Sequence, residues 1–376
     1  MSILSFLGNK IISIIRNIGI LLTWVAGIVL IVSAYSGFID PEQTAIFAII
    51  GLLFPVALIA NVIFLLIWLI CRKWVQALTV IACMAICFPY ISTFSPININ
   101  NDSLSTNDST FKIISYNVMN FDDLEKNDNK EDNRTLRYIL NQDADIVMLQ
   151  EGSAKIKMDK LNLIKSLMPE LEEKYPYRER RLRDLVILSK YPYTIDNEHI
   201  ISKDAPKAIA YKINIDGKTL YLINVHLESI KLTDSDKELY REITDILNTP
   251  DKLNEQTVVD VKSTLLTKLA NAFHKRAVQA KEIKHYIDSL GDTNIIICGD
   301  FNDTPSSYSY RTIMGDDMSD AYHQCAFGPA ITFHTNRFYF RIDHVLYKGN
   351  IEAVNIERGN QKSSDHYPLL TTFKWK

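Results

Sequence analysis

This sequence has few cysteines, no surplus of basic charge and no cysteine–histidine spacing of the kind that binds zinc. It has 5 cysteines in 376 residues and a net charge of −3. Cys71, Cys83 and Cys87 fall in an apolar first part, and two distant cysteines, Cys298 and Cys325, do not make a disulfide framework. We interpret Cys298, in an apolar run, as a small buried residue. No cysteine–histidine spacing indicates structural zinc.

Charge is also nearly missing from residues 1–95. They carry 4 basic and 2 acidic side chains, whereas the rest of the chain carries 37 and 42 and is therefore net acidic. This balance argues against tight nonspecific DNA binding, which depends on Lys and Arg side chains that contact phosphates. A transporter is disfavoured as well, since transport paths usually contain ionisable residues.

Three long apolar runs fill the first part, and each has about the ~20 residues that cross a bilayer as a helix. They extend from about Ile18 to Phe38, from Thr44 to Ile70 and from Val75 to Phe94. A cleaved signal peptide fits less well because it has one short apolar core. Three buried core helices are the remaining alternative.

Loop charge predicts the orientation of these runs. Lys10 and Arg16 precede the first run, and Arg72 and Lys73 separate the second from the third. Basic loops stay in the cytoplasm. An odd number of spans then leaves the rest of the chain on the non-cytoplasmic side, in the periplasm of a cell with two membranes.

The sequence predicts a membrane anchor over 1–95, a polar linker over 96–110 and an α/β domain over 111–376. Strand-like and helix-like patterns alternate in the last part, and Asp216-Gly217 between two strand-like runs indicates a hairpin. This mixture favours a mixed sheet or a pair of sheets flanked by helices. Strands are predicted over 111–118, 145–150, 185–189, 211–215, 219–226, 295–298, 342–347 and 369–374, and helices over 135–142 and most of 236–287.

The stretch after the run Ile295 to Ile297 is the strongest functional signal. Asp300 and Asn302 follow it two residues apart, and in an extended segment such residues share one face. Polar residues end other strands in the same way: Asn117, Glu151 and His226. Asp343 and His344 lie in the next predicted strand, and Asp365 and His366 lie in a loop before the last one. Taken singly, Asn117, Glu151 and His226 are better explained as a turn former, a solvated group and a satisfied histidine; their joint order favours a site.

Ligand type narrows the choice of metal. Glu, Asp and Asn oxygens suit a hard cation such as Mg²⁺, Mn²⁺ or Ca²⁺. Phosphate-ester hydrolysis needs charge neutralisation, an aligned water and a general base. The residues therefore indicate a metal-assisted hydrolytic site.

Six motifs occur in an order that resembles the endonuclease/exonuclease/phosphatase family, the deoxyribonuclease-I-like phosphoesterases. They are SYNVMNF, LQE, NVHLES, CGDFNDTP, RIDHVLY and SSDHYPL, and they cover the chain from about Phe111 to the C-terminus. The resemblance implies a four-layer α/β sandwich with two central mixed sheets. Here it would follow the three-helix, all-α transmembrane region.

The resemblance also implies a role for each matching residue. Glu151 would be the main metal ligand, with Asn117 holding metal or phosphate and Asp365 beside the metal. Asp300 would orient or deprotonate the attacking water, supported by Asn302. Asp343 would pair with His366, which would contact the phosphate, and His226 would lie near the leaving group.

The sequence departs from the family at two places. Arg183-Asp184 stand where many relatives have glycine, which leaves the shape of one site wall open. A long helical segment between His226 and Arg276 is either a lid, a membrane-facing arm or plain helical packing. Arg178 and Arg181, within a cluster of four arginines, are candidates for substrate binding or parts of a solvated strand edge.

We therefore expect a membrane-anchored, Mg²⁺-dependent phosphodiesterase whose substrate is a lipid headgroup or another phosphodiester. A tethered nuclease is the alternative among enzymes, and a catalytically silent binding module is the alternative outside them. Loss of Asp300, Glu151 or His366 would have favoured the silent module, and all three are present.

Overall fold

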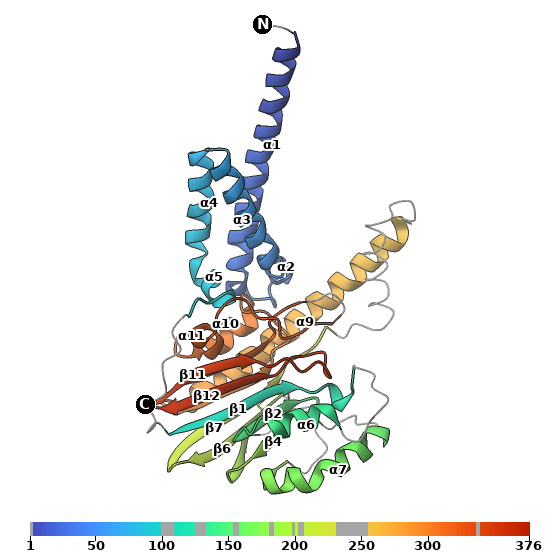
Figure 1. Ribbon diagram of the computed structural model, residues 1–376, viewed down its shortest axis with the longest axis vertical. Helices are drawn as coiled ribbons and strands as arrows, with labels where there is room; N and C mark the ends of the chain where they lie inside the picture. Colours follow the sequence, from blue (N-terminus) through green and yellow to red (C-terminus); the bar gives the residue numbers. More distant parts are fainter. Residues whose placement is uncertain are drawn as a thin grey trace.

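The computed structural model describes residues 3–98, 109–124, 133–152, 158–179, 184–197, 200–201, 207–230, 255–335 and 339–376. A helical region, residues 3–94, stands on an α/β domain, residues 109–376, and the N-terminus lies at the far end of the first helix (Figure 1). The helical region comprises α1 (Ile3–Ala34), η1 (Ser36–Phe38), α2 (Ile46–Gly51), α3 (Phe54–Ile70), α4 (Trp74–Ile86) and α5 (Phe88–Phe94).

Two of the three predicted apolar runs are broken into pairs of helices. The second run forms α2 and α3, and the third forms α4 and α5. Pro55 and Pro89 stand in the first turns of α3 and α5, where the missing amide hydrogen of proline costs least. Among the described helices, Lys10–Phe38 alone is long and apolar enough to cross a membrane by itself. The pair α4 and α5, bent by 69°, qualifies only if it is one span, and α3 has 17 residues.

Two six-stranded mixed sheets form the centre of the α/β domain. The first has the order β11-β12-β1-β2-β4-β3 and the second the order β5-β6-β7-β8-β10-β9. In the first lie β1 (Thr110–Asn117), β2 (Ile146–Gln150), β3 (Tyr177–Arg178), β4 (Val186–Ser189), β11 (Ile351–Arg358) and β12 (Leu369–Trp375). In the second lie β5 (Tyr193–Asn197), β6 (Ala208–Ile215), β7 (Lys218–His226), β8 (Ile295–Asp300), β9 (Ser319–Asp320) and β10 (Asp343–Lys348).

Helices cover the outer face of each sheet. α6 (Arg134–Asn141) and α7 (Met158–Lys174) pack on the first sheet, and α9 (Glu255–Ser289) and α10 (Tyr308–Met314) pack on the second. A third apolar core fills the space between the sheets, where Ile113 and Ile187 from one sheet meet Leu222 and Ile296 from the other. The prediction of an α/β domain with two central mixed sheets is confirmed.

The predicted hairpin at Asp216-Gly217 is confirmed, with Ile215 opposite Lys218. Both turn residues have positive φ, 55° and 79°, which a two-residue hairpin of this kind requires. Several short elements escaped prediction, among them α10, β9 and α11 (Ala321–Cys325). These have 7, 2 and 5 residues, too few to display a period.

The helical region is bonded to the α/β domain. Arg341 Nη2 donates to the carbonyl of Thr93 over 2.9 Å, and Lys281 pairs with Asp40 over 2.5 Å. The guanidinium of Arg311 lies 3.4 Å from the ring centroid of Phe38. The helical region and the α/β domain therefore hold a fixed relative position in the structure.

Candidate active site

Three strands of the second sheet bring candidate residues to one level. β7 is parallel to β8 and places His226 beside Asp300, while antiparallel β10 places Asp343 opposite Asp300. In the first sheet, Asn117 ends β1 beside Gln150, the last residue of β2, so Glu151 follows at the same edge. The strand ends of both sheets thus meet at one place.

Asp300 is the centre of this arrangement and is 1% exposed. Its Oδ2 accepts a hydrogen bond from Asn117 Nδ2 over 3.1 Å, which joins the two sheets. Asn302 donates to the same carboxylate through its backbone N–H (2.7 Å) and through Nδ2 (3.3 Å). The strand ends at Asp300 and Asn302 has φ 52°, so a turn brings the two side chains together rather than the extended segment that we predicted.

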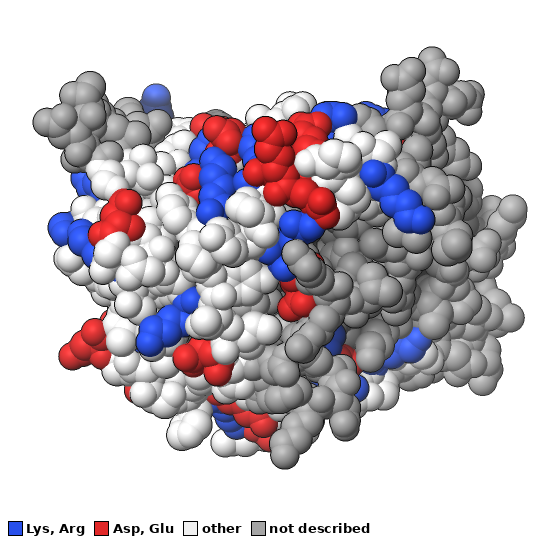
Figure 2. Space-filling view, turned by 90° about the horizontal axis from the view of Figure 1, so that it is seen from below, with Lys and Arg blue, Asp and Glu red and all other residues white. Residues whose placement is uncertain are grey.

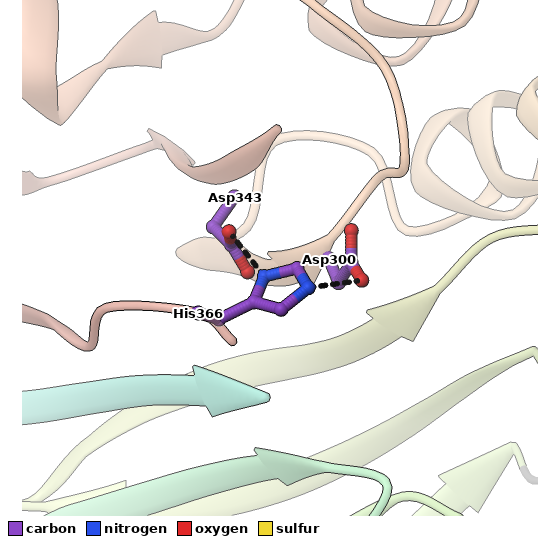
Figure 3. Close-up of side chains that lie close together, drawn as sticks. All are labelled: Asp300, Asp343 and His366. Atoms are coloured by element: carbon purple, nitrogen blue, oxygen red, sulfur yellow. Dashed lines mark hydrogen bonds and ion pairs between the residues drawn. The ribbon is translucent and has the colours of Figure 1, made fainter. Parts of the chain in front are cut away.

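His366 lies between two carboxylates (Figure 3). Its Nδ1 is 2.8 Å from Asp343 Oδ2, and its Nε2 is 3.6 Å from Asp300 Oδ2. Because a carboxylate only accepts hydrogen bonds, Nδ1 carries the proton. Burial lowers the pKa of His366, but the charges of Asp343 and Asp300 outweigh it and raise that pKa to about 10. The imidazole is therefore held in its charged form.

His226 approaches Asp300 from the other side. Its Nδ1 is 2.7 Å from Asp184 Oδ2, and its Nε2 is 3.8 Å from Asp300 Oδ2. Burial lowers the pKa of His226, but the hydrogen bond and charge of Asp184 outweigh it, so the net shift is upward. The Nε2 atoms of both imidazoles face Asp300 Oδ2, at distances too long for a hydrogen bond. A bound anionic oxygen would be stabilised by both.

Glu151 is held by side-chain nitrogens and lies near the carboxylates of Asp365, Asp184 and Asp300. Its Oε2 accepts from Asn120 Nδ2 over 3.0 Å, and its Oε1 lies 3.5 Å from Asn117 Nδ2 and 3.9 Å from His226 Nε2. Burial raises the pKa of Glu151, and the charges of Asp365 and Asp300 add to the rise. Carboxylates that repel one another at a partly exposed position suit a divalent cation, which would remove the repulsion.

A second group of ligand atoms lies close together. Three buried residues each offer one possible ligand atom, and these atoms lie within 4.8 Å of one another. The residues are Asp300, Asp343 and His366. This spacing would let the three share an ion. In the structure His366 already fills the space between the two carboxylates, and its pairing with Asp343 supplies positive charge there. The carboxylates of Glu151 and Asp365 therefore fit a hard cation better than this histidine-centred group does.

Three candidates lie apart from this cluster or outside the described residues. His344 faces the opposite side of β10, where its Nε2 lies 2.9 Å from the carbonyl of Asp303. Arg178, in edge strand β3, pairs with Glu172 of α7. Arg181 lies outside the described residues, as do 231–254, most of the helical segment for which a lid or an arm was considered. Within the described part, α9 continues as a single helix from Glu255.

Sequence reasoning missed Asp184 as a partner of His226. The sequence signal was present, since an aspartate stands two residues before the apolar strand β4, but we treated it as a missing glycine. Its carbonyl accepts from Gly152 N over 2.8 Å, which holds the segment next to Glu151. Ser364 was missed as well: its hydroxyl donates to the carbonyl of Asn117 over 2.7 Å and accepts from His366 N over 3.2 Å.

Comparison with known proteins gives two family matches. The model described as "Endonuclease/Exonuclease/phosphatase family" matches residues 114–366, and a domain of unknown function, DUF8431, matches residues 10–94. No curated protein matches the chain.

Solved structures of similar proteins cover the α/β domain. The endonuclease/exonuclease/phosphatase from Bacteroides vulgatus is 17% identical over 71% of this chain and 100% of its own, with a TM-score of 0.45. The protein described in the same words from Beutenbergia cavernae is 13% identical over 71% and 72%, with a TM-score of 0.44. The human Nocturnin catalytic domain is 14% identical over 72% and 96%, with a TM-score of 0.43.

The family match extends over most of the chain and includes every strand end described above. It confirms the resemblance that the six motifs indicated. This chain belongs to the endonuclease/exonuclease/phosphatase family and is a phosphoesterase of that family.

Proposed function

We propose that this chain is a membrane-anchored, divalent-metal-dependent phosphodiesterase that hydrolyses the headgroup ester of a lipid. The proposed hydrolysis is supported chiefly by the position of Asp300 between two imidazoles, each of which is paired with a second carboxylate. The fixed position of the α/β domain against an apolar helical region supports the membrane part.

Glu151, Asn117 and Asp365 would hold Mg²⁺ or Mn²⁺. When bound, the cation would neutralise charge on the phosphate and on the developing oxyanion. The clustered carboxylates near Glu151, with a raised pKa there, agree with such a ligand set.

Asp300 is positioned to orient and deprotonate the attacking water. Its carboxylate is held by Asn302 and Asn117, so that its lone pairs point in a fixed direction. His366, charged and held by Asp343, would stabilise the phosphoryl oxygens. His226, held by Asp184, would donate a proton near the leaving group.

A lipid substrate is favoured by where apolar and charged side chains lie. Of the 36 exposed large apolar side chains among the described residues, 28 belong to the helical region. Patches of this size on a protein surface mark contact with lipid or another protein. The face of the α/β domain away from the helical region carries Lys, Arg, Asp and Glu interspersed, and its described residues form no broad basic track for nucleic acid (Figure 2).

The location follows from the loop charges. With Lys10, Arg16, Arg72 and Lys73 on the cytoplasmic side, the α/β domain would face the periplasm or the exterior. Protease added outside spheroplasts should then digest the α/β domain, and protection until lysis would contradict this orientation.

The decisive assay offers full-length protein two substrates side by side, plasmid DNA and phosphodiester lipids in liposomes. Asp300→Ala is the blank. We expect headgroup release that EDTA abolishes and Mg²⁺ or Mn²⁺ restores. Nicking of DNA alone would replace the lipid substrate by a tethered nuclease, and activity that ignores chelation would refute the metal-dependent mechanism.

A further inference from the structure

Exposed large apolar side chains outside the helical region are few and unevenly placed. Among the described residues of 95–376 there are eight, and four of them fall in two short segments next to the helical region. These four are Ile97 (73% exposed), Phe327 (69%), Tyr339 (58%) and Ile331 (40%). We call them the interfacial patch.

Ile97 and Phe327 are held side by side. They form an antiparallel bridge, and Gly328 N donates to the carbonyl of Pro96 over 2.8 Å. Asn98 Nδ2 donates to the carbonyls of His323 and Ala326 over 2.9 and 2.8 Å. Two large apolar side chains are thus fixed in solvent by backbone bonds, which is costly unless something covers them.

The patch lies where the helical region meets the α/β domain. Ile97 follows Phe94, the last residue of α5, by three residues, and three residues span at most about 11 Å. Phe327 follows α11, which packs against α5 (Figure 1). Ile97 and Phe327 therefore lie close to the end of α5.

Tyr339 and Ile331 reach the same level from another loop. Phe340, next to Tyr339, lines a narrow cavity with Phe54, Pro55 and Phe94 of the helical region. Thr332 N, next to Ile331, donates to the carbonyl of Phe340 over 2.9 Å. Both loops that carry the patch are thus attached to the helical region.

We propose that the interfacial patch inserts into the headgroup layer of the bilayer beside α5; this rests on the membrane location proposed above. The headgroup layer is roughly 5–8 Å deep on each side, and aromatic residues concentrate in it. The patch holds the α/β domain on the bilayer surface at a fixed height. The substrate then reaches the strand ends from the membrane plane rather than from bulk solvent.

Tryptophan quenching tests the contact directly. Phe327→Trp in full-length protein is reconstituted in phosphatidylcholine vesicles whose acyl chains carry bromine. We expect the added fluorescence, measured as the difference from the parent protein, to be quenched at least twofold relative to unbrominated vesicles. Tyr177→Trp, on the exposed edge strand β3, is the matched control and should stay unquenched.

Trp24 and Trp74, exposed on α1 and α4, report whether the helical region itself meets lipid. If they are quenched and the fluorescence added by Phe327→Trp is not, the patch proposal is wrong while the anchor stands. If neither the native pair nor the added tryptophan is quenched, both the anchor and the patch are refuted.

Activity gives a second, separate reading. The double variant Ile97→Ser with Phe327→Ser changes no residue of the candidate active site. We expect its hydrolysis of lipid in vesicles to fall roughly tenfold, since two apolar contacts with the bilayer are lost, while its rate on a soluble phosphodiester stays unchanged. Equal rates on vesicles for the variant and the parent would overturn the proposal.

Discussion

Asp343 acts through His366, because the negative charge of Asp343 stabilises the charged form of the histidine. Asp343→Asn keeps the shape but removes the largest of the three carboxylate charges that raise the pKa of His366. We expect kcat to fall by about 10²–10⁴ with little change in KM, because charge stabilisation is lost chiefly in the transition state. Steady-state kinetics on the substrate identified above measures this.

Asp288→Asn on α9 is the matched control. Asp288 pairs with Lys284 at the surface and has no part in the site. Its kcat should stay at the parent value. Circular dichroism melting should show both variants folded, and a normal kcat for Asp343→Asn would remove that residue from the assigned chemistry.

His344 makes the stability of the domain depend on pH. Burial and the charge of Arg341 lower the pKa of His344 to about 3, whereas an unfolded histidine titrates near 6.5. Below pH 6.5 the unfolded chain therefore takes up a proton that the native state does not. The contribution of His344 to stability is complete above pH 6.5 and is lost as the pH decreases from 6.5 toward 3, by up to about 1.4 kcal/mol per pH unit.

His344→Gln removes this proton while its side-chain amide still reaches the carbonyl of Asp303. We expect the free energy of unfolding between pH 7 and pH 5 to change less steeply in the variant than in the parent. Urea unfolding at several pH values measures the two slopes. Identical slopes would mean that His344 does not stay neutral in the native state.

The contact between β7 and β8 depends on Gly299. Its φ is 144°, and a Cβ built there would lie 1.9 Å from the carbonyl oxygen of Val225. Gly299→Ala should push the two strands apart next to His226 and Asp300. We expect a loss of about 3 kcal/mol in the free energy of unfolding, together with loss of activity.

Gly217 offers the comparison, since a Cβ there meets nothing within 4 Å. Gly217→Ala changes the hairpin between β6 and β7 and should cost only about 1 kcal/mol for its positive φ, with activity retained. Equal losses in the two variants would show that strand separation is not the cause. Chemical denaturation and the hydrolysis assay provide both readings.

The packing of the helical region against the α/β domain depends on a close approach at Gly37. A Cβ on Gly37 would lie 2.6 Å from the carbonyl oxygen of Ser306 and 2.8 Å from that of Ser307. Gly37→Val should therefore separate η1 from the start of α10. We expect amide hydrogen exchange in residues 304–311 to become at least about tenfold faster.

Ser36→Ala is the control for this variant. It removes a long hydrogen bond of 3.4 Å to the carbonyl of Ser306 and a 2.8 Å bond to the carbonyl of Ser33 within the helical region, and it adds no atoms. Exchange in residues 304–311 should then stay close to that of the parent. Unchanged exchange in Gly37→Val would mean that the two parts do not press together at η1.

Local patterns in the sequence were enough to predict the class of the domain and most of the strand ends from which the site is built. Asp300 and Glu151 could be found because an apolar run that ends in polar residues is a local pattern, and order along the chain is enough to match a family. The hairpin at Asp216-Gly217 is equally local, since it rests on two adjacent residues.

Which of these side chains meet depends on the packing of the folded chain. Asp184 and His226 are 42 positions apart, and their 2.7 Å contact depends on how β4 and β7 are placed in two different sheets. His344 follows Asp343 directly, yet the alternation of β10 turns it away from the site. The closeness of Ile97 to Phe327 likewise has no local signal. Contacts between distant segments arise from packing and register, which no short stretch of sequence contains.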